Sequence, residues 1–309
     1  MKNLFGDPYN LDPVKINMYA DEIQSKQCPY TKERWIYIGL IVENLSHPLL
    51  NDIISERFLN NFDKTSLYYN KNNRIIHWSE INSADSKNIC KRWFKYILDP
   101  NKSGRKFYAY ILGINDSKLN RNKFGSVDQF SSKYNRFFRS AILYALKSFF
   151  PNRKIIVKNI YHEEGQQQTH EYFPWHCIYK IKQNEKNITF DCSKVEFLPK
   201  DHRKDKKSNL IQLCDVFMGA TTSIIHGIKK SNTSKYHEEL MALIYPLVKR
   251  MIKNHNNVNS GYQHTNRIMI RFFPKKEISS GTFRENSNLF YVKRNLLFED
   301  EINQQGFLF

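Results

Sequence analysis

One apolar segment, residues 209–227 (NLIQLCDVFMGATTSIIHG), constrains the fold more than any other part of the chain, because it contains a single carboxylate, Asp215. A helix built from this segment would be hydrophobic on every side, and such helices are buried. A buried carboxylate must be protonated, hydrogen-bonded, paired with a cation or bound to a metal. The segment therefore predicts a central buried helix and partners for Asp215 elsewhere in the chain.

The chain is long enough and apolar enough to form a large folded domain. It has 309 residues, of which 40% are hydrophobic and 14% aromatic, and these fractions are too high for a disordered protein. Its five cysteines are scattered, without the spacing of a zinc ribbon or a disulfide framework. We find neither a signal peptide nor an apolar run of the roughly 18 residues that span a bilayer. We therefore expect a cytoplasmic protein with no membrane partner.

A strong positive charge points to a polyanionic partner. The chain carries 48 Lys and Arg against 30 Asp and Glu, a formal charge of +18, and nucleic acid is the first candidate for such a surface. The alternative is a solvated surface rich in Lys, or a bias in genomic base composition. A predicted helix and a charged loop carry the candidate nucleic-acid-binding residues: Lys133, Arg136, Arg139 and Lys147 on the helix, and Arg203, Lys204, Lys206 and Lys207 in the loop.

Apolar runs and helical spacings alternate along the chain and predict an α/β fold with a mixed sheet. We predict strands at residues 14–20, 35–42, 74–78, 106–114, 154–160 and 187–191. The predicted helices start at Pro48 and then cover residues 83–98, 126–150, 209–227 and 236–254. A closing strand pair is expected at residues 267–273 and 290–297. We expect one domain over residues 1–230, with residues 231–309 as a helical and β extension packed on it.

Acidic residues stand at the ends of three predicted strands, and these are Asp21 with Glu22, Glu163 with Glu164, and Asp191. Strand ends at one edge of a sheet converge, so these acids are expected to approach Asp215. A cluster of carboxylates repels itself unless divalent cations neutralise it, and carboxylate oxygens select Mg²⁺ or Mn²⁺. Two such ions can activate water and stabilise the leaving oxygen in phosphodiester hydrolysis.

The same residues carry short motifs that resemble a bacterial family of domains of unknown function, the DUF3800 type. The motifs are YADE at residues 19–22, DCSK at residues 191–194 and QLCD at residues 212–215, and the resemblance covers residues 14–228. It implies a ribonuclease H-like mixed sheet flanked by helices. The family usually has Ser where Ile23 stands and Ala where Cys214 stands, and its Asp-Ser-Lys motif is interrupted here by Cys192.

The resemblance also implies roles for the acidic residues. Asp21 is implied to be the central metal ligand, with Asp215 as the second carboxylate and Glu163 or Glu164 as the third. Gln212 lies three residues before Asp215, on nearly the same helix face, and is expected to orient a ligand or contact substrate. Glu22 and Asp191 complete the candidate metal set, but Glu22 alternates away from Asp21 on a strand and Asp191 can equally cap a turn. For Asp215 the alternative is a buried acid held by the backbone or by Arg.

These observations predict a nuclease dependent on Mg²⁺ or Mn²⁺ that hydrolyses RNA or DNA. The alternative is a module of the same fold without hydrolysis, which binds nucleic acid or recruits a protein partner. The resemblance places either in a defence or mobile-element system. His77 stands where the family often carries His and is expected to be a satisfied histidine or, alternatively, to assist proton transfer. The chain has no phosphate-binding glycine loop, nucleophile elbow or zinc ligand set.

Overall fold

The computed structural model describes residues 12–28, 32–119, 129–165, 185–226, 234–253 and 267–273, together with residues 168, 178, 181 and 182. The predicted strand at residues 290–297 and the side chain of Lys133 lie outside the described residues.

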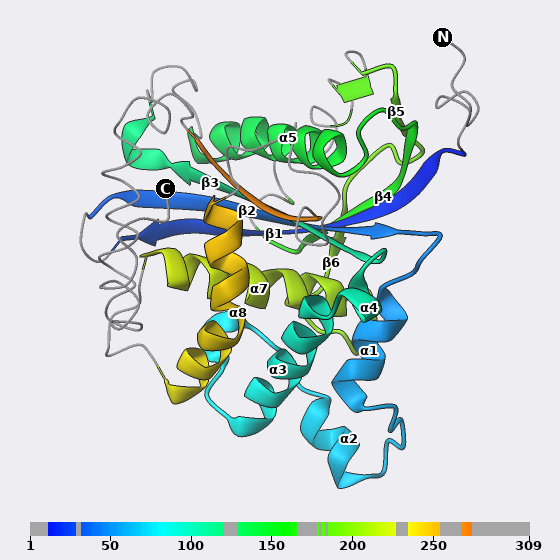
Figure 1. Cartoon of the computed structure of the whole chain (residues 1–309), viewed down its shortest axis with the longest axis vertical. Coiled ribbons are helices and arrows are strands. Elements are labelled where there is room, and N and C mark those ends of the chain that lie inside the picture. The colour runs from blue at the N-terminus through cyan, green and yellow to red at the C-terminus, as the bar shows by residue number, and fades with distance from the viewer. Residues whose placement is uncertain are drawn as a thin grey trace.

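A seven-stranded mixed sheet forms the centre of the molecule (Figure 1). Its strands are β1 (Val14–Gln27), β2 (Arg34–Asn44), β3 (Phe107–Asn115), β4 (Ile155–Glu163), β5 (Ile188–Phe190), β6 (Glu196–Leu198) and β7 (Ile268–Phe273). The strand order is β5-β4-β1-β2-β3-β7, and β6 also pairs with β4. β2 runs antiparallel to both β1 and β3, while β4 is parallel to β1 and β7 is parallel to β3. The predicted α/β fold with a mixed sheet is confirmed.

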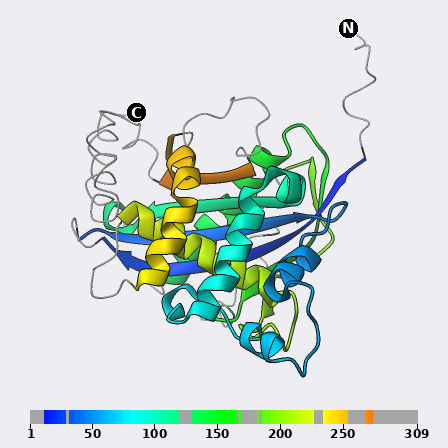
Figure 2. The same ribbon diagram turned by 60° about the horizontal axis from the view of Figure 1, so that its bottom comes forward.

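Helices cover both faces of this sheet, which is why its central strands are apolar on both sides. α5 (Gln129–Phe149) lies on one face, and α7 (Ser208–His226) lies directly on the other (Figure 1). We call these the α5 face and the α7 face. An outer layer covers α7, and in it α3 and α8 lie side by side (Figure 2). The helices of this layer are α1 (Leu50–Phe58), α2 (Leu67–Asn72), α3 (Ala84–Leu98), α4 (Pro100–Ser103) and α8 (Lys235–Lys253).

The apolar segment that contains Asp215 forms α7, and every residue of this helix is buried, as its composition predicts. Two glycines allow its neighbours to approach closely. A Cβ on Gly39 of β2 would lie 2.9 Å from the Cys214 sulfur, and a Cβ on Gly219 would lie 2.2 Å from the ring of Trp78. α7 is therefore held between the sheet and the segment that contains Trp78.

The structure differs from the predicted elements in two places near α7. β1 continues past Ala20 to Gln27, because β2 pairs with it along this stretch, so Asp21 and Glu22 lie within the strand rather than after its end. The strand predicted at residues 74–78 is wrong. This segment is irregular and leads into a short 3₁₀ helix, η2 (Trp78–Glu80).

The C-terminal elements are built into the same domain. β7 pairs with β3 at the edge of the sheet, where a separate strand pair with residues 290–297 was expected. Apolar side chains of α8 and β7 belong to the core that surrounds α7. The described part of residues 231–309 therefore packs on the first domain and completes its sheet.

Candidate active site

Three acidic side chains from three elements meet on the α7 face, and these are Asp21 of β1, Glu163 of β4 and Asp215 of α7. In the parallel register of β1 and β4, Ala20 pairs with His162, so the residues that follow, Asp21 and Glu163, are neighbours. On its other side Asp21 pairs with Gly39, which lies against Cys214, the residue before Asp215. We call Asp21, Glu163 and Asp215 the acid cluster.

The carboxylate of Asp21 is buried among other acids, which disfavours its charged form. It is 6% exposed, and its Oδ1 accepts a hydrogen bond from the backbone N–H of Glu22 at 2.8 Å. Burial, and then the charges of Asp215 and Glu163, raise the pKa of Asp21 well above its usual range. Among the described residues, no Lys or Arg forms an ion pair with it. An acid in such surroundings is a functional-site candidate.

Asp215 has partners from the irregular segment before η2. Its Oδ2 accepts a hydrogen bond from the backbone N–H of Trp78 at 2.6 Å, and its Oδ1 lies 3.6 Å from Nε2 of His77. Burial raises the pKa of Asp215 to about 6, even though His77 and the Trp78 N–H oppose the rise. The His77 side chain is 31% exposed, and its Nδ1 lies 2.7 Å from the Ser79 hydroxyl. His77 therefore links the buried Asp215 to solvent.

Glu163 forms an ion pair with a lysine that sequence reasoning did not single out. Its Oε1 lies 2.6 Å from Nζ of Lys200, whose side chain is 57% exposed. The hydrogen bond with Glu163 raises the pKa of Lys200, and the charges of Asp21 and Asp215 add to the rise. Lys200 and His77 are the exposed members of the site, so solvent reaches the acid cluster from their side.

Gln212 holds the walls of this site together. It is buried, and its Oε1 accepts hydrogen bonds from Arg57 at 2.5 Å and from the backbone N–H of Ile76 at 3.2 Å. Its Nε2 donates to the backbone carbonyl of Lys200 at 2.7 Å. Both ends of the amide are thus engaged with the protein. The structure gives Gln212 a positioning role within the protein, and the predicted role of orienting a ligand or contacting substrate stays a prediction.

Arg57 is a second residue that sequence reasoning missed. It is fully buried, it donates to the Arg74 carbonyl at 2.9 Å, and its guanidinium lies 4.9 Å from the centre of the Trp93 ring. Burial lowers its pKa to about 9. A signal for it existed, because Arg57 lies four residues after Ile53, on the apolar face of its helix. For Lys200 we find no local signal.

Glu22 lies on the opposite face of the sheet from the acid cluster. Its Oε2 is 3.0 Å from Nε2 of His162, and the hydroxyl of Tyr134 on α5 lies 2.6 Å from the same nitrogen. Neighbouring residues of a strand point to opposite faces, so Glu22 cannot share an ion with Asp21. Its position agrees with the alternation expected for it.

Glu164 and Asp191 are exposed and do not join the acid cluster. The backbone N–H of Glu164 donates to the Leu198 carbonyl, which fixes the turn after β4. Asp191 follows β5 and forms an ion pair with Lys158. Of the predicted metal ligands, the structure therefore brings together Asp21, Glu163 and Asp215, and leaves Glu22, Glu164 and Asp191 apart from them.

The two predicted basic regions lie on different sides of the sheet. Arg136, Arg139 and Lys147 belong to α5, on the face away from the acid cluster, and Lys147 forms an ion pair with Glu185. The charged loop, residues 199–207, joins β6 to α7 and contains Lys200. Lys200 of this loop therefore lies next to the acid cluster. Within the loop, Arg203 pairs with Asp201 and Lys207 with Asp205, and the remaining candidates are Lys204 and Lys206.

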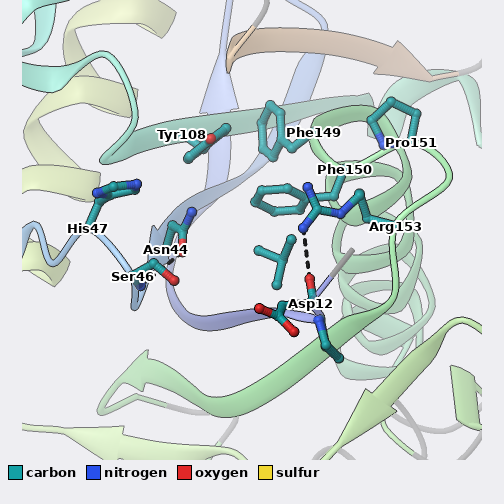
Figure 3. Close-up of a pocket in the computed structure, with 11 residues that line it drawn as sticks. Asp12, Asn44, Ser46, His47, Tyr108, Phe149, Phe150, Pro151 and Arg153 are labelled. Atoms are coloured by element: carbon teal, nitrogen blue, oxygen red, sulfur yellow. Dashed lines mark hydrogen bonds between the residues drawn. The ribbon is translucent and has the colours of Figure 1, made fainter. Parts of the chain in front are cut away.

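A hollow of about 390 Å³ lies elsewhere, near the start of β1 (Figure 3). Aromatic rings of Tyr108, Phe149 and Phe150 line it, and Arg153 donates to the Asp12 carbonyl at 2.8 Å. Asp12 supplies the one carboxylate among its lining residues. Because this hollow lacks a second acid, we place the candidate chemistry at the acid cluster.

No protein-family model matches the sequence, and no curated protein matches it significantly. None of the helices in the described ranges is long and apolar enough to cross a membrane. Function is therefore inferred from the geometry of the acid cluster.

Proposed function

We propose that this protein is a divalent-metal-dependent nuclease that hydrolyses phosphodiester bonds of RNA or DNA at the acid cluster. One observation carries the proposal: carboxylates from β1, β4 and α7 meet in a buried place where their charges raise the pKa of Asp21. Like charges brought together in this way need a cation before all of them can ionise. The motif resemblance implies a ribonuclease H-like fold, and the mixed sheet with β1 between β2 and β4 supports it.

The chemistry of the donor set fits Mg²⁺ or Mn²⁺, because carboxylate oxygens are the hard ligands that these ions prefer. Asp21, Glu163 and Asp215 are the residues that would hold the ion. When bound, such an ion neutralises the acids and makes water a stronger nucleophile. In the structure Glu163 is engaged by Lys200 and Asp215 by Trp78. Within the described part of the chain, no three His, Cys, Asp or Glu side chains are arranged as a metal site.

The surroundings of the acid cluster support a polyanionic substrate. Residues 199–207 include Lys200, which pairs with Glu163, and the exposed Lys204 and Lys206, and phosphate contacts by such side chains give most of the affinity of nucleic-acid binding. α5 covers the other face of the sheet, so its basic residues do not border the acid cluster. We therefore assign substrate contact to the loop rather than to α5.

His77 supports acid–base chemistry at the same site. It approaches Asp215 at 3.6 Å and is partly exposed. Each of the two ring nitrogens of an imidazole can hold a proton, so His77 can carry a proton between the acid cluster and solvent. Its contact with Ser79 holds the ring in place.

Cleavage assays with end-labelled single- and double-stranded RNA and DNA test the proposal. We expect cleavage of at least one substrate with Mg²⁺ or Mn²⁺ and none with EDTA. Glu163→Gln should abolish cleavage while its neighbour Glu164→Gln retains it, and circular dichroism should show that both variants are folded. Undiminished cleavage by folded Asp21→Asn and Asp215→Asn variants would exclude the assignment.

The same structure offers a reason to consider a second candidate, a binding module without hydrolysis that recognises nucleic acid or a protein partner. Lys200 already supplies a positive charge to Glu163. This reading predicts salt-sensitive nucleic-acid binding and no uptake of Mn²⁺ by the purified protein. Calorimetric titration with Mn²⁺ therefore separates the two candidates.

A further inference from the structure

Lys200 combines a fixed backbone with a side chain that extends into solvent. Its carbonyl oxygen accepts a hydrogen bond from Gln212, which Arg57 holds in turn. Its ammonium group lies 2.6 Å from Glu163, but its side chain is 57% exposed. The ion pair can therefore open by rotation of the side chain alone.

α7 positions this lysine and the acid cluster together. Gln212 and Asp215 are three residues apart and so lie on one face of the helix. The first of them fixes the backbone of Lys200 and the second is a member of the acid cluster. The distance between the Lys200 backbone and the Asp215 carboxylate is thus set by one rigid element.

A divalent cation and the Lys200 ammonium would compete for the same carboxylate oxygen, Oε1 of Glu163. Two positive groups at one oxygen repel each other, and the repulsion is weakly screened next to a buried site. Occupation by one therefore weakens occupation by the other. The ammonium is the one that can leave, because solvent already surrounds most of its side chain.

We propose that Lys200 is an exchangeable counter-ion of the acid cluster. It neutralises Glu163 while no divalent cation is bound, it is displaced when one binds, and the released ammonium then contacts a phosphate of the substrate strand. This inference rests on the proposed nuclease function. It gives one residue two successive partners, a carboxylate and a phosphate, both within reach of the same fixed backbone position.

Calorimetric titration of the full chain with Mn²⁺ tests the first part. Lys200→Met keeps the length of the side chain and removes its charge, and we expect it to bind Mn²⁺ about two- to fivefold more tightly than the unsubstituted chain, as for a pair exposed on one side. Lys200→Arg should restore the original affinity. Lys158→Met is the matched control, because Lys158 pairs with the exposed Asp191 away from the acid cluster, and it should leave the affinity unchanged.

Steady-state kinetics at saturating Mn²⁺ tests the second part, and Lys200→Met should raise the KM for nucleic acid while kcat changes less. Opposite effects on metal and substrate would not arise from a lysine that only stabilises the fold. Weaker or unchanged Mn²⁺ binding by folded Lys200→Met overturns the counter-ion role, and an unchanged KM overturns the phosphate contact. Failure of the unsubstituted chain to bind Mn²⁺ would instead reject the metal-dependent function itself.

Discussion

Asp21 and Glu22 are adjacent in the chain and both have largely buried side chains, yet their surroundings shift their pKa values in opposite directions. Asp21 points to the α7 face, where burial and the charges of Asp215 and Glu163 raise its pKa. Glu22 points to the α5 face. Burial also disfavours its charge, but the contact with His162 lowers its pKa. Both residues are acids with largely buried side chains. What distinguishes the candidate site is therefore the kind of neighbour, since other acids surround Asp21 and a histidine contacts Glu22.

The same separation recurs on the adjoining strand. His162 contributes to the α5 face and Glu163 to the α7 face, because side chains alternate along β4. One face of the sheet thus holds a matched pair, Glu22 with His162, directly behind the acid cluster on the other face. A matched pair stabilises its surroundings, whereas grouped acids destabilise theirs until a cation or a proton arrives.

The largest expected effect comes from replacing Asp21 and Glu22, one at a time, by the corresponding amides. Asp21→Asn should lower kcat/KM for nucleic-acid cleavage by a factor on the order of 10³, because it removes the central carboxylate. Glu22→Gln should keep the activity within about threefold and lower the free energy of unfolding by about 2 kcal/mol. Kinetics and urea unfolding measure both. An equal loss of activity in the two variants would show that the faces are not functionally separate.

The next effect concerns the pH dependence of stability. The pKa of Asp215 is about 6 in the folded protein, against 3.8 for an ordinary Asp. The folded state therefore binds this proton more tightly than the unfolded state, and the free energy of unfolding falls as the pH rises from about 4 to about 6. In Asp215→Asn the amide oxygen can still accept from Trp78. The free energy of unfolding of this variant, relative to that of the unsubstituted chain, should be up to about 3 kcal/mol higher at pH 8 than at pH 4. Urea unfolding in EDTA at several pH values measures it, and a gain independent of pH would contradict the assignment of the proton to Asp215.

A smaller effect should follow from crowding the contact between α7 and Trp78. An added methyl group in Gly219→Ala would meet the Trp78 ring, and the shift it forces should cost about 1–3 kcal/mol. Because the backbone N–H of Trp78 bonds to Asp215, nuclease activity should also fall. Gly165→Ala, where the new methyl group meets no atom within 4 Å, is the control. Equal Tm values for the two variants would show that this contact does not hold the site.

The smallest effect is expected at Asp191. This acid is exposed and pairs with Lys158, and surface ion pairs contribute little to stability. Asp191→Asn should change the free energy of unfolding by less than about 0.5 kcal/mol and leave cleavage within twofold. A loss of activity as large as that of Asp21→Asn would return Asp191 to the candidate metal set.

Local patterns predicted most of the helices and strands, and they failed where backbone groups find partners far away in the chain. The continuation of β1 to Gln27 contains Gln24 and Lys26, whose polarity suggested a loop, but pairing with β2 extends the strand. Residues 74–78 (RIIHW) suggested a strand, but two of their N–H groups, those of Ile76 and Trp78, bond to side chains of α7. Tertiary hydrogen bonds decided both cases, and no local propensity records them.

The sequence by itself determined that a carboxylate would be buried in an apolar helix, because the composition of residues 209–227 leaves no polar face for Asp215. It also determined that the side chains of adjacent strand residues such as Asp21 and Glu22 would point to opposite faces of the sheet. Only the tertiary structure decided which of them would meet Asp215. Alternation places the two side chains on opposite faces of the sheet, but it does not determine on which face α7 packs. Likewise, the register of β1 with β4 places Glu163 beside Asp21. The hydrogen bonds of Gln212 position the backbone of Lys200. These contacts join residues far apart in the chain, so only the tertiary structure could determine them.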